Sequence, residues 1–312
     1  MAPDLVLPDY GGACLSGILG ALDEPGRPAP WLPEPARRAD QVVLLVLDGL
    51  GWNQLGERQP LAPTLAAMAG GPITSVVPST TATALASITF GVPPADHGVL
   101  GYRMRVGDDE VLNVLRWSTS AGDARASVPP GAFSRGESFR GRTVPVVTRG
   151  EFAGSGFTEA HLGTAPLVGW YTPSGIAVEV ARLLGDGEPL VYAYYDGIDK
   201  VAHVHGFGAH YDAELRAADR LVAELVDVLP AGACLLVTAD HGQVQVGDAL
   251  LALPGDVLDA VALATGEGRF RWFHTRPGVP ADALAARLAD RYEADGTAWV
   301  RTREAVIDEG WF

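Results

Sequence analysis

Acidic and histidine side chains recur in short clusters along this sequence. Asp199 and His203 are four residues apart, Asp240 directly precedes His241, and Asp48 follows an apolar run. Side chains four residues apart can face one ion, whether the segment is a helix or a tight loop. Mixed aspartate and histidine ligands suit Zn²⁺ or Mn²⁺ better than Ca²⁺ or Mg²⁺, which favour shells of oxygen alone. These residues are therefore candidate ligands of a Zn²⁺ or Mn²⁺ site.

Hydroxyl groups gather before a segment of small residues, in the sequence Pro78-Ser79-Thr80-Thr81 that precedes residues 82–90. Such a cluster ahead of an apolar helix is normally an N-cap. The same place can hold a phosphate, because a helix N-terminus offers free N–H groups and the positive end of its dipole. One hydroxyl could then act as a nucleophile if a neighbouring group activates it. The residues alone leave both interpretations open.

The candidate ligands follow apolar runs, which are Gln41–Leu47, Leu190–Tyr195 and residues 233–237. Continuous apolar runs are typical of strands buried on both faces, and they favour a parallel sheet covered by helices. Open α/β sheets bind ligands at the carboxyl ends of their strands. Taken alone, Asp48 would more simply cap a helix expected at residues 52–55. Three acids near three strand ends instead predict a metal-binding edge of one sheet.

Residues 103–170 are rich in Gly, Ser and Arg and have little regular periodicity. A loop-rich region of this length inside an α/β chain is commonly an insertion or a lid. Only residues 143–147 within it suggest a strand, whereas residues 211–229 beyond it predict a clear amphipathic helix. We expect one catalytic domain over residues 1–312, with residues 103–170 as an insertion or lid within it.

Composition narrows the classes of partner. The formal net charge is -15, from 38 acidic and 23 basic residues, which argues against binding to polymeric nucleic acid. The two cysteines, Cys14 and Cys234, lie far apart and outside any zinc-finger spacing.

We expect no membrane contact and a cytoplasmic location, because no apolar run approaches ~20 residues and no signal-peptide pattern opens the chain. The final aromatics, Trp311 and Phe312, predict either a further C-terminal piece or a terminus docked on the core.

Four motifs together resemble the alkaline phosphatase superfamily and, within it, the nucleotide pyrophosphatase/phosphodiesterase family. They are VVLLVLDGLGW around Asp48, VPSTTATALASITFGVPPADHG around Thr81, YDGIDKVAHVHG around Asp199 and LLVTADHG around Asp240. Asp-His-Gly alone is a weak signal, but four motifs in the family's order, each at a predicted strand end, are specific. The resemblance implies an alkaline-phosphatase-like α/β fold, with a mostly parallel central sheet, helices on both faces and a small inserted lid.

The resemblance also implies two divalent metal ions, which we expect to be Zn²⁺, with Mn²⁺ as the alternative. One ion would be held by Asp199, His203 and His274, and the other by Asp48, Asp240, His241 and the oxygen of Thr81. The family's nucleophile lies three residues after the proline, which favours Thr81 over Thr80 and Ser79. Attack by Thr81 would give a phosphothreonine intermediate, which metal-bound water would hydrolyse.

Other residues near the motifs are weaker candidates. His205 remains open as a ligand, and His210 also lies near a motif. We expect His97 to fix the loop after the nucleophile's helix, and Asp196 to orient a ligand or cap a turn. Ala84 departs from the family, in which many members have an asparagine three residues after the nucleophile. The substrate oxygens would then rely on the metals and on backbone N–H groups, so Ala84 bears on specificity.

The implied activity is metal-dependent hydrolysis of phosphodiester or phosphoanhydride bonds in a small molecule such as a nucleotide. A phosphomonoesterase on the same scaffold is one alternative. It would need a cationic clamp for a doubly charged phosphate, for which Arg103, Arg105 and residues 269–271 are the candidates. A non-catalytic metal-binding protein that has kept the fold is a second alternative. It predicts metal binding without turnover.

Overall fold

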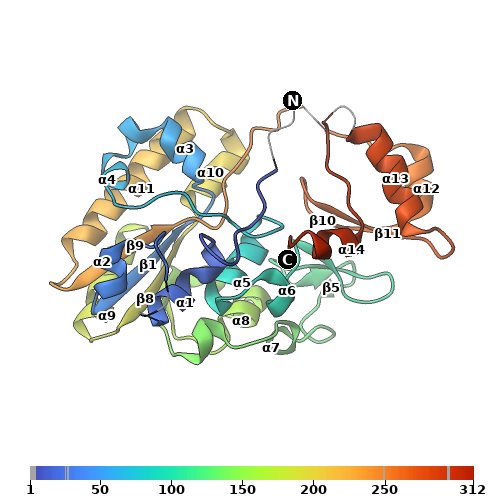
Figure 1. Cartoon of the computed structure of the whole chain (residues 1–312). Helices are drawn as coiled ribbons and strands as arrows, with labels where there is room; N and C mark the ends of the chain where they lie inside the picture. The colour runs from blue at the N-terminus through green and yellow to red at the C-terminus, as the bar shows by residue number, and fades with distance from the viewer. Residues whose placement is uncertain (1–4, 25, 27, 249, 294–295) are drawn as a thin grey trace.

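Five parallel strands form the central sheet of the protein, in the order β7-β6-β8-β1-β9. The computed structural model describes residues 5–24, 26, 28–248, 250–293 and 296–312 (Figure 1). The strands are β1 (Gln41–Leu47), β6 (Val146–Arg149), β7 (Leu167–Trp170), β8 (Leu190–Tyr195) and β9 (Ala233–Thr238). This arrangement confirms the predicted α/β class and the mostly parallel sheet.

Helices cover both faces of this sheet, as the continuous apolar runs predict (Figure 1). Alternate residues of β1 enter two different cores: Val42, Leu44 and Val46 join one, and Val43, Leu45 and Leu47 join the other. The first core is shared with α1 (Ile18–Asp23), α5 (Thr81–Phe90) and α8 (Gly156–Leu162). The second is shared with α4 (Pro63–Ala66), α9 (Ser174–Gly185), α10 (Gly197–His205) and α11 (Ala209–Asp227).

Three strands end at the same edge of the sheet. Leu47, the last residue of β1, pairs with Tyr195, the last residue of β8. Val46 of β1 pairs with Thr238, the last residue of β9. The segments that carry the predicted acids therefore leave the sheet side by side, because parallel strands in register release their chains at one edge.

A second, antiparallel sheet has the order β11-β10-β2-β3-β4-β5. Its strands are β2 (Arg103–Arg105), β3 (Val111–Asn113), β4 (Ser118–Thr119), β5 (Gly122–Asp123), β10 (Val261–Gly266) and β11 (Arg271–Thr275). A separate apolar cluster joins β10 to α12 (Gly255–Ala260) and α13 (Ala281–Tyr292). Figure 1 shows these two helices beyond the second sheet, in orange and red.

The segment 103–170 is divided between the two sheets. Its first part supplies β2 to β5 of the second sheet, and its last part supplies β6 and β7 of the central sheet. The strand expected at 143–147 begins three residues later, at Val146. The segment therefore contributes strands to both sheets, and the insertion or lid role expected for residues 103–170 stays a prediction.

The shorter elements complete the chain. They are α2 (Glu34–Arg38), α3 (Trp52–Glu57), α6 (Pro94–His97), α7 (Pro130–Phe133), α14 (Arg303–Asp308), η1 (Leu15–Gly17), η2 (Gln59–Leu61), η3 (Ser138–Gly141) and η4 (Gly150–Phe152). The final aromatics are docked, since the ring of Phe312 lies 5.5 Å from that of Trp272, and Trp311 is buried. In the described part of the chain, no helix is both long and apolar enough to cross a bilayer.

Candidate active site

Asp48 directly follows the carboxyl end of β1 and is buried in the protein interior. Its backbone N–H continues the ladder by donating to the carbonyl of Tyr195 at 2.9 Å, and the residue is 2% exposed. The next helix, α3, has Gly51 as its N-cap residue. Asp48 is therefore not the cap of that helix, which was the simpler interpretation of its position.

The ring of His241 lies between two buried carboxylates. Its Nε2 is 3.5 Å from Asp48 Oδ1 and 3.3 Å from Asp240 Oδ2. The other oxygens are bound: Asp240 Oδ1 accepts from the N–H groups of Gly49 and His241, and Asp48 Oδ2 accepts from the Tyr194 hydroxyl. Among the described residues, Asp48 Oδ1 and Asp240 Oδ2 are buried without a hydrogen-bond partner. Two buried carboxylate oxygens thus face the His241 ring without a hydrogen-bond partner of their own.

Thr81 is the first residue of α5 and reaches the same ring. His241 Nδ1 lies 2.9 Å from the Gly242 carbonyl, which can only accept, so Nδ1 carries a proton. In the neutral ring Nε2 is then an acceptor, and the Thr81 hydroxyl donates to it over 3.0 Å. Thr80 is the N-cap residue, but within the described residues its side chain makes no capping hydrogen bond to α5. The hydroxyl cluster is therefore not used as an ordinary side-chain cap.

Asp199 joins this group from the first turn of α10. Single ligand atoms of Asp48, Asp199 and His241 all lie within 4.8 Å of one another. The Gln243 side chain donates to Asp199 Oδ1 at 2.7 Å, and His203 Nε2 lies 3.4 Å from the same oxygen. The His203 side chain is 75% exposed, against 16% for Asp199, so His203 stands at the rim.

The start of α10 is fixed by ion pairs to the buried carboxylate of Asp196. Arg149 Nε donates to both carboxylate oxygens of Asp196, at 2.7 and 2.8 Å, and Lys200 Nζ lies 2.7 Å from one of them. Asp196 is the N-cap residue of α10, which carries Asp199 one turn further on. This arrangement is consistent with the prediction that Asp196 orients a ligand, because Asp196 anchors the helix that carries Asp199.

The charges of the group favour a bound cation. Burial raises the pKa of Asp48 well above its ordinary value, and the nearby charges of Asp240 and Asp199 raise it further. Burial also raises the pKa of Asp199, although His203 and His241 act against it. Burial opposes protonation of His241, but Asp240 and its other neighbours outweigh burial, so its pKa is raised. Unpaired buried oxygens beside an imidazole fit a divalent ion such as Zn²⁺ or Mn²⁺.

His274, the predicted third ligand beside Asp199 and His203, lies on a different element from those two residues. It is on β11 of the second sheet, where Thr265 Oγ1 lies 3.1 Å from its Nε2. It lines a hollow of about 480 Å³ together with Arg105 and Arg276. Burial and the charge of Arg105 lower the pKa of His274, and a neighbouring guanidinium also disfavours a cation. In the described part of the chain, His274 is not in the close group formed by Asp48, Asp199 and His241, and its role as a ligand stays a prediction.

The remaining histidines have other surroundings. His97 is fully buried: its Nδ1 accepts from the N–H of Val99 at 3.1 Å, and its Nε2 lies 2.7 Å from Ser87 Oγ. This confirms that His97 fixes the loop after α5. His205 and His210 are exposed and stacked, with ring centroids 3.9 Å apart. In the described part of the chain, neither belongs to the group around Asp48.

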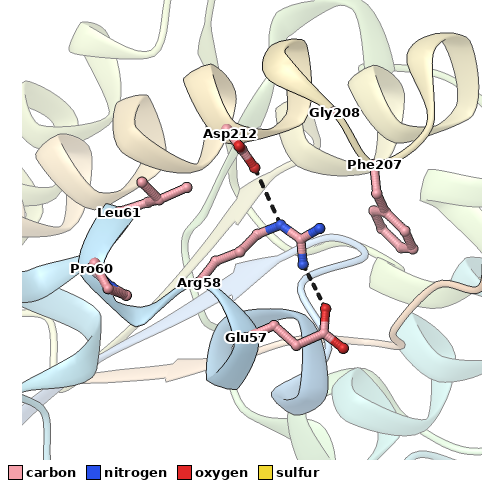
Figure 2. Close-up of a pocket in the computed structure, with 7 residues that line it drawn as sticks. All are labelled: Glu57, Arg58, Pro60, Leu61, Phe207, Gly208 and Asp212. Carbon is pink, nitrogen blue, oxygen red and sulfur yellow. Dashed lines mark hydrogen bonds and ion pairs between the residues drawn. The ribbon is translucent and has the colours of Figure 1, made fainter.

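A pocket of about 460 Å³ lies where residues 57–61 meet the start of α11 (Figure 2). Arg58 crosses it and is held by Glu57 at 2.7 Å and Asp212 at 3.2 Å. Its guanidinium also lies over the rings of Phe207 and Tyr211. Both carboxylates in Figure 2 are thus engaged by Arg58, which marks a structural ion cluster and not a second set of free ligands.

Residues 42–259 match the family model of type I phosphodiesterase / nucleotide pyrophosphatase. The chain belongs to this family. No curated protein matches it. The family match includes Asp48, Thr81, Asp199 and Asp240, which are the centres of the four motifs.

Solved structures with a similar fold include a phosphodiesterase of the mouse. Murine ectonucleotide pyrophosphatase/phosphodiesterase 5, as an inactive threonine-to-alanine variant in complex with AMP, has a TM-score of 0.58 at 14% identity, over 81% of this chain and 70% of that one. The same murine protein in a second structure gives 0.56 at 15%, over 80% and 70%. These likenesses show that the phosphodiesterase-family chain has an alkaline-phosphatase-like fold.

Phosphonoacetate hydrolase from Sinorhizobium meliloti, in complex with phosphonoformate, is a further similar structure. It has a TM-score of 0.45 at 20% identity and covers 66% of this chain. The chain spans 57% of the length of that hydrolase.

Three residues of this family member's site were not found from the sequence. Tyr194 donates to Asp48, Gln243 donates to Asp199, and Glu267 lies near the hydroxyl of Thr80. Tyr194 lies within a buried strand pattern. Gln243 directly follows the last motif, which ends at Gly242, and Glu267 lies outside all four motifs. Ala84 is fully buried in the core on α5, so its methyl group packs in the interior.

Proposed function

We propose that this protein hydrolyses phosphodiester or phosphoanhydride bonds of small phosphorylated molecules such as nucleotides. One observation carries the proposal: the Thr81 hydroxyl, at the N-terminus of α5, lies 3.0 Å from His241 Nε2 beside the buried carboxylates of Asp48 and Asp240. Family membership supports the reaction class, and the AMP bound to the murine relative supports a nucleotide-like substrate.

The proposed ligands divide into two groups. Asp48, Asp240, His241 and the Thr81 oxygen would hold one ion, and Asp199 with His203 would contribute to a second. The donor types favour Zn²⁺ or Mn²⁺. A bound divalent ion would supply Lewis-acid chemistry, lowering the pKa of a hydroxyl and offsetting negative charge on phosphate.

The residues of the chain would then act as follows. The Thr81 oxygen would attack phosphorus while the bond from phosphorus to the leaving oxygen breaks, and the hydroxyl proton would pass through solvent to the departing oxygen, because both ring nitrogens of His241 are occupied when it holds the ion. Backbone N–H groups at the start of α5 bind the non-bridging oxygens. A water molecule attacks the phosphothreonine, which frees the Thr81 oxygen and releases the phosphoryl product. Because α5 is buried over residues 82–90, its N-terminus is held rigidly during both steps.

A paired assay tests this proposal. Protein stripped of metal and reconstituted with Zn²⁺ or Mn²⁺ is given bis-p-nitrophenyl phosphate or p-nitrophenyl phosphate. We expect the diester to be the better substrate, and Thr81→Ala to lose at least about 10³-fold in kcat because the nucleophile is gone. Thr172→Ala makes the same chemical change at an exposed position and is the matched control.

The outcomes separate the candidate functions. Full activity in Thr81→Ala would exclude Thr81 as the nucleophile. Dominant turnover of the monoester would identify a phosphomonoesterase. Tight metal binding without turnover of either ester would identify a non-catalytic metal-binding protein.

A further inference from the structure

The hairpin between β10 and β11 brings a carboxylate to the nucleophile's helix. Gly266 has a φ of +88°, and a Cβ there would lie 2.1 Å from the Phe270 carbonyl oxygen, so this tight turn requires glycine. The N–H of Glu267 closes the turn by donating to the same carbonyl at 2.7 Å. The side chain of Glu267 is therefore carried on a defined turn and not on a loose loop.

The hairpin packs against the segments on either side of α5, near Pro78 before the helix and near Leu100 and Gly101 after it. A Cβ on Gly101 would lie 3.5 Å from Gly266 Cα and 3.9 Å from Pro78 Cγ, so the backbone of Gly101 lies close to that of Gly266 and to the ring of Pro78. Trp272 of β11 donates from Nε1 to the carbonyl of Leu100 at 3.3 Å. These contacts place the turn beside Pro78, three residues before the nucleophile.

Glu267 itself reaches the start of α5. The hydroxyl of Thr80, the N-cap residue, is close enough to the Glu267 carboxylate to favour its ionised form, although burial raises the pKa of Glu267 overall, and the charge of Glu267 acts on His241. Its side chain is half-buried. A negative group therefore lies at the end of α5 where the free N–H groups would bind phosphate oxygens.

We propose that Glu267 is a specificity-determining residue that disfavours substrates whose phosphate carries two negative charges. This inference rests on the proposed phosphoester hydrolase function. A diester phosphate has one negative charge, whereas a monoester phosphate has nearly two above its second pKa of about 6. A fixed carboxylate beside the phosphate repels the second charge more strongly than in water, since the site is partly buried. Glu267 thus favours diesters over monoesters.

Two arginines flank the same turn and affect the charge around Glu267. Gly266 pairs with Arg271 on one side and with Arg103 on the other, and both arginines are exposed. The charge of Arg271 also acts on Glu267. While Glu267 is ionised, it offsets this cation. Removing the carboxylate would leave Arg271 as an uncompensated positive charge beside this turn. A dianionic phosphate requires such a positive charge.

The test compares Glu267→Gln with the wild type on p-nitrophenyl phosphate and bis-p-nitrophenyl phosphate at pH 8. We expect the monoester-to-diester ratio of kcat/KM to rise about tenfold, the factor that ~1.4 kcal/mol gives. Glu267→Asp keeps the charge and should keep the wild-type ratio. Adding Arg271→Gln to Glu267→Gln should remove most of the gain. The matched control is Glu304→Gln, an exposed glutamate on α14. An unchanged ratio in folded Glu267→Gln would overturn the inference.

A binding measurement keeps this test separate from catalysis. In metal-loaded Thr81→Ala, calorimetry compares inorganic phosphate, a dianion at pH 8, with dimethyl phosphate, a monoanion. Adding Glu267→Gln should raise the affinity for phosphate relative to dimethyl phosphate by about tenfold. If the wild type cleaves neither ester, the proposed function fails while this comparison still decides the role of Glu267. Equal ratios with and without the substitution, or no binding of either anion, would refute it.

Discussion

Replacing Asp48 by asparagine should affect the metal-free and metal-loaded proteins in opposite directions. The amide would keep the shape of the side chain and could still accept from Tyr194, but one of three neighbouring negative charges would be gone. The pKa of Asp48 is raised in the folded protein, so its ionised form is penalised there and stability is lost as pH rises above the unfolded value. At pH 7.5 without metal, we therefore expect Asp48→Asn to stabilise the fold by about 1–3 kcal/mol.

The metal should reverse this order. A ligand present at a thousand times its Kd stabilises the folded state by about 4 kcal/mol. For 312 residues, an unfolding entropy of about 2.1 cal/mol/K per residue gives roughly 0.65 kcal/mol/K. Metal should thus raise the Tm of the wild type by about 6 °C. In metal-free protein, Asp48→Asn should raise Tm by about 2–5 °C, but it should lose most of the metal-induced increase because a ligand is missing.

Differential scanning calorimetry of protein treated with EDTA, before and after addition of Zn²⁺ or Mn²⁺, measures both effects. Asp290→Asn, which removes an exposed carboxylate on α13, is the control and should leave both Tm values unchanged. Two results would refute the reasoning. One is a metal-free Tm that falls in Asp48→Asn, and the other is a metal-induced increase that this variant retains in full.

Three further predictions concern other parts of the molecule. Burial lowers the pKa of His97 to about 3 and of His161 to about 4. The stability that depends on their neutral forms is therefore complete above pH 6.5 and is lost as the pH falls below it. Urea titrations should show the free energy of unfolding fall by roughly 3–5 kcal/mol per histidine by pH 4 to 3. Arg149→Gln should lower the Tm by about 3–5 °C, because Asp196 is left buried with less compensation, and should weaken metal binding in calorimetry. His274→Ala should bind Zn²⁺ as the wild type does, and a loss of binding would restore His274 as a ligand.

The central strands could be predicted because their burial on both faces leaves a continuous apolar run. Gln41–Leu47 and Leu190–Tyr195 have the bounds that the sequence indicates, and β9 extends one residue further. The strands β6 and β7 are only four residues long and lie in a segment rich in turn residues. Their membership in the central sheet is decided by tertiary packing, which a local pattern does not carry.

The candidate site was predictable only where it depends on strand ends. Asp48, Asp199 and His241 converge because parallel strands end together, which needs no knowledge of side-chain contacts. This reasoning does not extend to His274, because its strand belongs to the other sheet and runs antiparallel to its neighbour. Glu267 had no local signal, since it meets Thr80 only after the hairpin has packed beside α5.

The two halves of the candidate metal site differ in how firmly the fold holds them. Asp240 is fully buried, with one oxygen fixed by two backbone N–H groups, so it loses little freedom when an ion binds. His203 is largely exposed, and its side chain must be ordered by the ion itself. We therefore expect the ion beside Asp48 and Asp240 to bind more tightly than the ion beside Asp199 and His203. The buried half carries the Thr81 hydroxyl, so the more rigid half is the one that would position the proposed nucleophile.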